Sequence, residues 1–397
     1  MTTGTSSAAG EGVVIAGGGL AAQRCAETLR RLGYEGRVRM VCAEPHLPYD
    51  RPPLSKAALR DPAAADSVGF RSADWYQDKA IEALRGVAAS GLDAAAHRVA
   101  LSDGSTLHYE QLVIATGAKP RMLPAFAGYE NVGTLRTLED SRAISELLAA
   151  RVRLLIVGAG FIGQEVASGA RAAGVEVTVI EAEPLPLHGI LGREIGEWFA
   201  ALHRGEGVDL VLGHAVAQIH GADRVEAVTL DDGRRVETDH VLIGIGVVAD
   251  LDWLAGSGLP AAGIPTDAGG RSELPDVYAA GDAAAFFDAF LGRHALSGHW
   301  ESAGRQGAVV ANAIMDRELP TPAVSSFWSD QYGTRIQYLG HAQLADRVTL
   351  DGDPGERDFT AVYTRDGEPV AALVVGRPQA LPELRDRLRY ITERPPG

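Results

Sequence analysis

Two glycine-rich turns constrain the fold of this 397-residue chain more than any other feature. The first, at residues 17–22, reads GGGLAA, and the second, at residues 158–163, reads GAGFIG. Each follows a short apolar run and precedes a segment with the apolar spacing of a helix. Two parallel strands need a helical crossover of this kind. Each turn therefore predicts a β-α-β unit, and the pair indicates an internal duplication of architecture.

The glycine spacing also has a chemical meaning. A G-x-G-x-x-G pattern lets backbone N–H groups at the start of a helix approach a pyrophosphate. Ala22 replaces the third glycine of the first turn, whereas the second turn matches the full pattern. A single turn of this type also occurs without a ligand, but two in the correct strand-turn-helix context predict two dinucleotide sites. The expected contacts come from Gly17, Gly19, Ala21, Gly158, Gly160, Ile162 and Gly163.

An acidic residue follows the second strand of each unit. Glu44 and Glu181 stand where a carboxylate is expected to accept hydrogen bonds from a ribose. Glu183 adds negative charge beside Glu181, and neither Lys nor Arg follows before Arg193. This charge would repel a 2′-phosphate, so the second turn is predicted to bind NADH in preference to NADPH. The first unit is interpreted as the permanent FAD site.

Composition and charge argue against several other classes of protein. The net charge of −15 disfavours nucleic acid as the main partner. No apolar run reaches the ~20 residues of a membrane helix, and the polar run at residues 1–7 resembles no secretion signal. Cys25 and Cys42 form no CxxC motif, and the histidines lack metal-ligand spacing. The expectation is a cytoplasmic protein with no metal site and no membrane partner.

The predicted elements indicate an α/β fold with three domains. Asp-Gly pairs at 103–104 and 232–233 predict a hairpin within each unit, and short strand-like runs alternate after residue 327. We expect two Rossmann-like dinucleotide-binding domains, for FAD and NAD, and a small C-terminal α+β domain. The predicted boundaries are a flexible tail at 1–10, an FAD-binding domain at 11–120 and 250–322, an NAD-binding domain at 121–249 and a C-terminal domain at 323–397.

Further motifs occur in order along nearly the whole chain. They are RPPLSK at 51–56, ATGAKPR at 115–121, LRTLED at 135–140, GQE at 163–165, YAAGD at 278–282, HW at 299–300 and FWSDQYG at 327–333. Together they resemble the oxygenase-coupled, NADH-dependent ferredoxin reductases, which include putidaredoxin reductase and the reductases of ring-hydroxylating dioxygenases. The resemblance implies the fold of glutathione reductase without its redox disulfide.

The resemblance also implies roles for individual residues. Lys56 would lie near the flavin N5 and pair with Glu165, the two residues expected to act at the catalytic centre. An interdomain surface salt bridge is the alternative for this pair. Further contacts to FAD are implied for Arg51, Thr116, Arg136, Asp282, Trp300 and Trp328. Ordinary surface arginines, a helix-capping aspartate and buried core tryptophans are the alternatives for these positions.

The implied reaction is a hydride transfer from NADH to FAD, followed by single-electron transfer to a 2Fe-2S ferredoxin that serves a cytochrome P450 or a ring-hydroxylating dioxygenase. A ferredoxin is typically acidic, so local arginines would have to dock it. The candidates are Arg293, Arg305, Arg335, Arg385, Arg387 and Arg389. Gly298 stands where the family commonly has Glu, which leaves the local hydrogen bonding at the flavin open.

Other functions remain alternatives at this point. A rubredoxin reductase or an NADH oxidase would carry the same cofactor motifs. An NADH-sensing flavoprotein of similar fold is less favoured, because no long C-terminal insertion follows the motifs. A dithiol-disulfide reductase is disfavoured by the missing CxxC pair.

Overall fold

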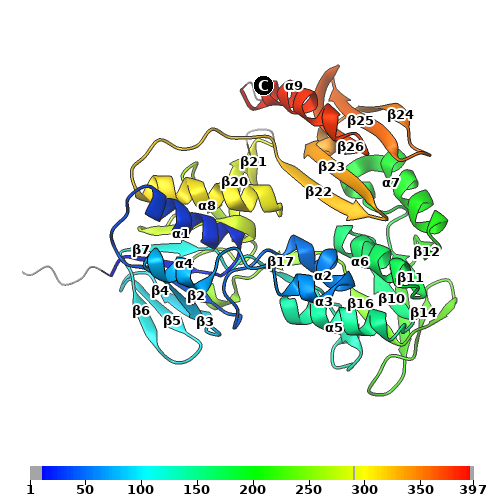
Figure 1. Ribbon diagram of the computed structural model, residues 1–397, viewed down its shortest axis with the longest axis horizontal. Coiled ribbons are helices and arrows are strands. Elements are labelled where there is room, and N and C mark those ends of the chain that lie inside the picture. Colours follow the sequence, from blue (N-terminus) through cyan, green and yellow to red (C-terminus); the bar gives the residue numbers. More distant parts are fainter. Residues whose placement is uncertain (1–10, 289–290, 394–397) are drawn as a thin grey trace, which may run out of the picture.

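The computed structural model describes residues 11–288 and 291–393. The predicted flexible tail at 1–10 lies outside these residues. The chain forms three units, and a five-stranded sheet lies at the centre of each (Figure 1). The expected fold class is confirmed: two dinucleotide-binding units are followed by a smaller C-terminal unit.

The first unit is built on a parallel sheet whose strands have the order β19-β7-β1-β2-β3. The sheet follows from the apolar run that precedes the first glycine turn, because all four residues of β1 are fully buried. The strands are β1 (Val13–Ala16), β2 (Val38–Cys42), β3 (Ile81–Arg85), β7 (Gln111–Ile114) and β19 (Val277–Ala279). Because β19 belongs to this sheet, the chain returns to the first unit after passing through the second.

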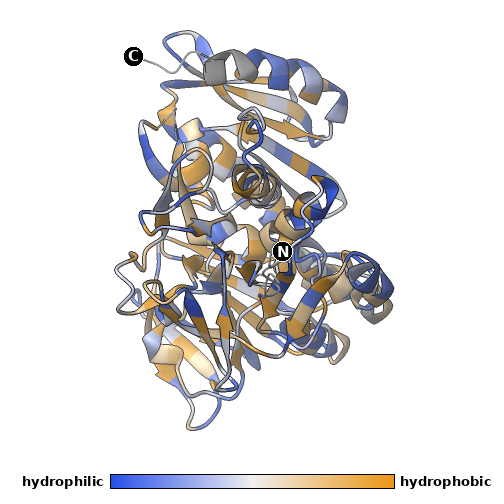
Figure 2. Cartoon of the chain, turned by 90° about the vertical axis from the view of Figure 1, so that its left-hand side faces the viewer, coloured by the Kyte–Doolittle hydropathy of each residue, from blue (hydrophilic) through white to orange (hydrophobic). Residues whose placement is uncertain are grey.

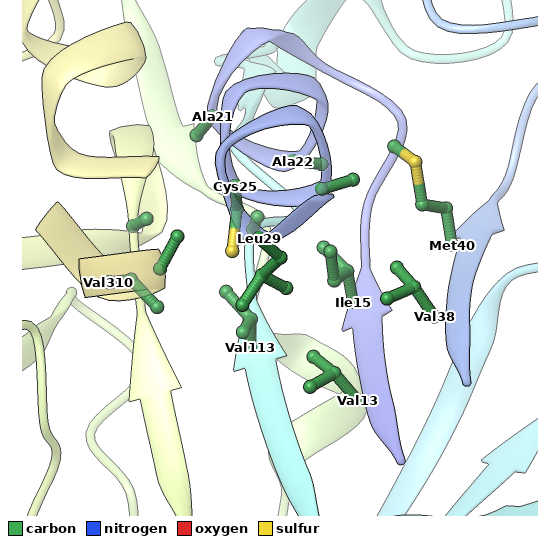
Figure 3. Packing of buried hydrophobic residues seen from close by; sticks show 14 of the residues in the cluster. Val13, Ile15, Ala21, Ala22, Cys25, Leu29, Val38, Met40, Val113 and Val310 are labelled. Atoms are coloured by element: carbon green, nitrogen blue, oxygen red, sulfur yellow. The ribbon is translucent and has the colours of Figure 1, made fainter. Parts of the chain in front are cut away.

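Helices α1 (Leu20–Arg31) and α8 (Trp300–Ile314) lie together on the first sheet (Figure 1). They pack so closely that a Cβ at Gly307 would come within 2.2 Å of the Ala21 carbonyl oxygen. Figure 3 shows Cys25 and Leu29 of α1 pointing into the core between this helix and the strands. Burial raises the pKa of the Cys25 thiol to about 12, and Cys42 is likewise buried and free. Both cysteines therefore act as small hydrophobic core residues.

Smaller elements complete the first unit. Its surface carries the sheets β4-β5-β6 and β18-β20-β21, and three short helices lie beside α1 and the second unit. These elements are β4 (Ala89–Asp93), β5 (Arg98–Leu101), β6 (Thr106–His108), β18 (Ile264–Thr266), β20 (Ala284–Asp288), β21 (Arg293–Leu296), α2 (Ala57–Arg60), α3 (Pro62–Ala65) and α4 (Ala73–Asp78).

The second unit repeats the arrangement. Its sheet has the order β12-β11-β10-β16-β9, with all pairs parallel. The elements are β9 (Val132–Gly133), β10 (Leu154–Val157), β11 (Val177–Glu181), β12 (Asp209–Leu212), β16 (His240–Ile243), the sheet β13 (Val216–His220), β14 (Ala227–Leu230) and β15 (Arg235–Glu237), and the helices α5 (Leu138–Ala149), α6 (Phe161–Ala172) and α7 (His188–Gly205). A capping box of Thr137 and Asp140 begins α5.

The chain crosses between the first two units twice, and the two crossings pair as strands. β8 (Ala118–Pro120) runs antiparallel to β17 (Val247–Ala249). Thr116 strengthens this junction, because its hydroxyl donates to the Asp250 carbonyl at 2.8 Å. The predicted domain division at 120–121 and 249–250 falls beside this ribbon.

The third unit is an antiparallel sheet with the order β22-β23-β26-β25-β24, covered by α9. Its elements are β22 (Ser326–Gln331), β23 (Thr334–Gly340), β24 (Arg347–Asp353), β25 (Asp358–Arg365), β26 (Glu368–Val375) and α9 (Leu381–Glu393). Figure 2 shows hydrophobic residues along many of the strands and largely hydrophilic colour on α9. Over the residues described, no helix combines the length and the apolar character that crossing a membrane requires.

Candidate functional site

The first glycine turn joins β1 to α1 and leaves the start of the helix open. Gly17 has a φ of +141°, and a Cβ there would lie 2.1 Å from the Ala115 carbonyl oxygen. Gly19 is the N-cap of α1 and provides no side chain to bond the first N–H groups. A Cβ at Gly19 would meet no protein atom within 4 Å. This combination of free N–H groups and open space fits a pyrophosphate. Ala21, in contrast, lies in the core against α8.

The second glycine turn has the same construction between β10 and α6. Gly158 has a φ of +105°, and a Cβ on Gly163 would come within 2.4 Å of the Gly158 carbonyl oxygen. Gly160 is the N-cap of α6 and again contributes no side-chain cap. Ile162, on the first turn of α6, is 44% exposed although it is apolar. An exposed apolar residue beside open N–H groups fits the nucleotide contact predicted for it.

The carboxylate of Glu181 is bonded to the second glycine turn itself. One oxygen accepts from the Ala159 N–H at 2.7 Å, and the other accepts from the Glu183 N–H at 2.9 Å. The acid therefore fixes one side of the turn as well as standing where a ribose is expected. Glu44, in the first unit, is held by other partners: it accepts from the Tyr49 hydroxyl and from Arg51 at 2.6 Å.

Lys56 and Glu165 meet where the three units come together. The ammonium lies 2.7 Å from the Glu165 carboxylate, and the two side chains are only 14% and 3% exposed. This burial argues against an ordinary surface salt bridge. Ser55 donates to the same carboxylate, and Ser329 of β22 donates to its other oxygen at 2.6 Å. Glu165, on α6, thus binds residues from the first and third units at once.

Arg136 and Asp282 form a second charged pair at the entry to the second unit. Their side chains are 3.3 Å apart and are about one-quarter exposed, at 26% and 21%. Burial and the nearby positive charge of Arg51 lower the pKa of Arg136, but Asp282 and, to a smaller extent, Tyr49 offset part of that shift. The Arg136 carbonyl accepts from Arg51 at 2.6 Å. These contacts bring together three residues that were predicted separately as FAD contacts.

The two predicted tryptophans are in edge-to-face contact. The rings of Trp300 and Trp328 are 5.4 Å apart at an interplanar angle of 79°. Trp300 begins α8, and its indole N–H donates to Asp50 at 2.6 Å. Arg335 lies over Trp328, 5.3 Å from the ring centroid. Both indoles are partly exposed, so neither is an ordinary core tryptophan.

Three of the six predicted docking arginines have partners of their own. Arg335 pairs with Asp330 at 3.0 Å, and Arg385 lies 3.9 Å from Glu301. Arg305 donates to the Thr321 carbonyl at 3.4 Å. The side chain of Arg389 lies outside the described residues, and Arg293 and Arg387 stay predictions. Among the six, Arg335 is the one whose contact with Trp328 connects it to the predicted flavin side.

Sequence reasoning missed several polar residues at this centre. Ser55, Ser329 and Asp50 contact predicted site residues although no spacing rule connects them. A shallow hollow beside the end of β2 was missed for the same reason. It is lined by Pro45, Ala83, Leu84, Arg85 and Val87.

One group of potential metal ligands occurs among the residues described, next to Glu181, whose carbonyl accepts from the His214 N–H at 3.2 Å. His214, Asp231 and Asp232 place ligand atoms within 4.8 Å of one another. The His214 Nδ1 is hydrogen-bonded to Asp231 at 2.7 Å, and Arg234 contacts Asp232 at 3.4 Å. These contacts explain the group as a surface cluster of paired charges, without a metal ion.

Comparison with known proteins agrees with this geometry. The family described as pyridine nucleotide-disulphide oxidoreductase matches residues 11–307, and the one described as reductase C-terminal matches residues 326–392. The ferredoxin reductase component of chlorobenzene dioxygenase from Cupriavidus sp. (strain PS12) is 37% identical over 370 residues, which is 92% of this chain and 90% of that protein.

Solved structures give the same relationship. Putidaredoxin reductase, in its covalent complex with putidaredoxin, superposes with a TM-score of 0.91 at 33% identity, covering 96% of this chain and 94% of that one. The ferredoxin reductase for the CYP199A2 system of Rhodopseudomonas palustris has a TM-score of 0.88 at 34% identity, with 92% and 91% covered. The chain therefore belongs to the pyridine nucleotide-disulphide oxidoreductase family, and within it to the ferredoxin reductases of oxygenase systems.

Proposed function

We propose that this chain is an NADH-dependent ferredoxin reductase in which the first glycine turn holds FAD and the second receives NADH. When bound, FAD accepts a hydride from NADH and releases its electrons singly to an iron-sulfur ferredoxin. The ferredoxin is of the 2Fe-2S type and serves a cytochrome P450 or a ring-hydroxylating dioxygenase. The observation that carries the proposal is the buried pair of Lys56 and Glu165, which joins two units whose glycine turns have equivalent construction.

The roles of the chain's own residues follow from their contacts. The N–H groups at the starts of α1 and α6 bind the two pyrophosphates. Arg136 and Asp282 line the FAD site. The hollow beside the end of β2 receives the adenosine end of FAD. Lys56 supplies positive charge that favours an anionic reduced cofactor, and Glu165 holds the ammonium in place.

Partner docking is assigned to the face that carries Trp328 and Arg335. The net charge of −15 repels an acidic ferredoxin, so a local cation beside an aromatic ring must provide the attraction. We also propose a cytoplasmic location, since Cys25 and Cys42 are free and buried rather than joined in a disulfide.

Turnover with purified ferredoxins tests this function. With NADH and FAD present, we expect cytochrome c reduction to depend on an added 2Fe-2S ferredoxin and to weaken as salt screens the docking charges. A rubredoxin should support less turnover, and oxygen alone should support little. Turnover that is equally fast without any iron-sulfur protein would contradict the proposal and favour an NADH oxidase. A reduced flavin that passes no electrons to any partner would favour an NADH sensor.

Cofactor selectivity provides a second test. The substitution Glu181→Arg should lower the ratio of kcat/KM for NADH to kcat/KM for NADPH by roughly ten-fold or more, because a cation that can pair with the 2′-phosphate replaces a carboxylate that repels it. Glu181→Gln is the matched control, since its amide oxygen can still accept from the Ala159 N–H while the charge and the bond from the Glu183 N–H are removed. Its ratio should lie between those of the wild type and the arginine variant. An unaltered ratio in Glu181→Arg would refute the assignment.

A further inference from the structure

A series of three hydrogen bonds, two buried and one partly buried, connects the third unit to the second glycine turn. Tyr332 bonds the imidazole of His203 at 2.7 Å, His203 bonds the amide of Gln164 at 2.9 Å, and Gln164 bonds the Ala159 carbonyl at 2.8 Å. These residues come from the β22–β23 turn, α7 and α6 respectively. His203 and Gln164 are each 1% exposed. Their polar groups need these partners, because water does not reach them.

The direction of each hydrogen bond follows from the chemistry of the groups. Gln164 donates through Nε2 to the Ala159 carbonyl, so its Oε1 must accept. His203 therefore carries its proton on Nε2 and accepts the Tyr332 proton at Nδ1. Burial lowers the pKa of His203 to about 4, which keeps the imidazole neutral near pH 7. Burial also raises the pKa of Tyr332, so its hydroxyl remains a donor.

The backbone of Tyr332 gives independent support for a special role. Tyr332 and Gly333 form the two-residue turn between β22 and β23, and both have positive φ, of 49° and 73°. Turns of this kind favour Asn-Gly, and a bulky side chain is strained there. One contact holds the strained turn against the second unit: the Tyr332 N–H donates to Ser168 of α6 at 2.7 Å. Within the third unit, the Tyr332 carbonyl accepts from Arg357 at 3.2 Å.

The last of these hydrogen bonds, from Gln164 to Ala159, fixes the orientation of a peptide group in the glycine turn. Gln164 holds the Ala159 carbonyl, while Glu181 holds the Ala159 N–H at 2.7 Å. In a planar trans peptide, the carbonyl of one residue and the N–H of the next point in opposite directions. Fixing the Ala159 carbonyl therefore also aims the Gly160 N–H, at the N-cap of α6.

We propose that Tyr332, His203 and Gln164 form a positioning relay through which the docked third unit holds the second glycine turn in its NADH-binding conformation. The proposal rests on the assignment of NADH to that turn. None of the three residues touches the reacting atoms. They act by reducing the freedom of the turn before the dinucleotide binds, which strengthens binding without new contacts.

The test uses three variants of the FAD-containing protein. Tyr332→Phe and Gln164→Leu each break the relay at one link. Tyr363→Phe is the matched control, because the Tyr363 hydroxyl also joins the third unit to α7, at the Leu191 carbonyl at 2.8 Å, but has no connection to the glycine turn. Each relay variant should raise KM for NADH and the dissociation constant of NAD⁺ about three- to ten-fold. This is the change in affinity expected when the net stabilisation from one hydrogen bond is lost. The kcat and the FAD content should change little, and Tyr363→Phe should leave KM within about two-fold.

Two further measurements separate a relay from a loss of general stability. The double variant of Tyr332 and Gln164 should bind no more weakly than Gln164→Leu alone, because both changes interrupt one path. Amide hydrogen exchange at residues 158–163, without NADH, should be faster in Tyr332→Phe than in Tyr363→Phe. Additive effects in the double variant, or equal exchange in the two phenylalanine variants, would overturn the relay.

The Glu181→Arg variant distinguishes failure of the relay from failure of the proposed function. If this variant changes the NADH/NADPH preference while Tyr332→Phe leaves NADH binding unaltered, the relay is wrong and the NADH assignment stands. If Glu181→Arg also has no effect, the assignment of NADH to this turn fails. The exchange measurement still decides the relay in that case, because it needs no bound dinucleotide.

Discussion

Replacing Lys56 with Met should destabilise the protein and slow the reduction of its flavin by NADH. Glu165 is 3% exposed and would lose its only cationic partner among the ion pairs of the described residues. Removing one member of a buried pair typically costs about 3–5 kcal/mol, because the remaining charge is left uncompensated. Loss of the positive charge near the cofactor should also lower the rate of flavin reduction at least about ten-fold, which corresponds to about 1.4 kcal/mol.

A double variant separates these two effects. In Lys56→Met with Glu165→Gln, the buried group is neutral and can still bond Ser55 and Ser329. We expect this variant to regain much of the free energy of unfolding while flavin reduction stays slow. Urea unfolding and rapid mixing with NADH measure the two quantities. Recovery of the rate together with the stability would show that Lys56 has only a structural role, and unchanged kinetics in Lys56→Met would contradict its assignment to the site.

Strands and helices that depend on a local sequence pattern were predicted well, because a glycine turn and its flanking apolar runs indicate one strand and one helix directly. The strands at 13–16 and 154–157 and the helices that follow them are present as expected. The Lys56–Glu165 pair was implied by resemblance and is present as well. The roles of these residues toward FAD and NADH stay proposals.

Elements without an apolar signal were not predicted. β24 is almost entirely exposed, and it is a strand because it pairs with the edge of β25. α7 contains Gly189, Gly192 and Gly196, which weaken any helical signal, yet buried Leu191, Ile195 and Phe199 pack it against the third unit. Ser329 and His203 were missed for a different reason. Their partners are more than one hundred residues away or lie on another element, and no periodicity reports such a contact.

The two glycine turns allow a matched pair of substitutions. Gly19 and Gly160 have ordinary negative φ values of −90° and −74°, so alanine fits either backbone. An added Cβ meets no protein atom within 4 Å at Gly19 and only the Gly244 carbonyl oxygen at 3.5 Å at Gly160. Neither substitution should disturb the fold of the protein alone. A methyl group at either place would, however, occupy the space that a pyrophosphate needs.

The flavin content of the two purified variants is the most direct test that the turns bind different dinucleotides. Gly19→Ala should lose most of its FAD, roughly ten-fold or more in affinity, and keep the circular dichroism of the FAD-stripped wild type. Gly160→Ala should retain FAD at the wild-type ratio of flavin to protein and show at least about a ten-fold higher KM for NADH. Full flavin content in Gly19→Ala, or loss of flavin from Gly160→Ala with unchanged NADH binding, would contradict the account.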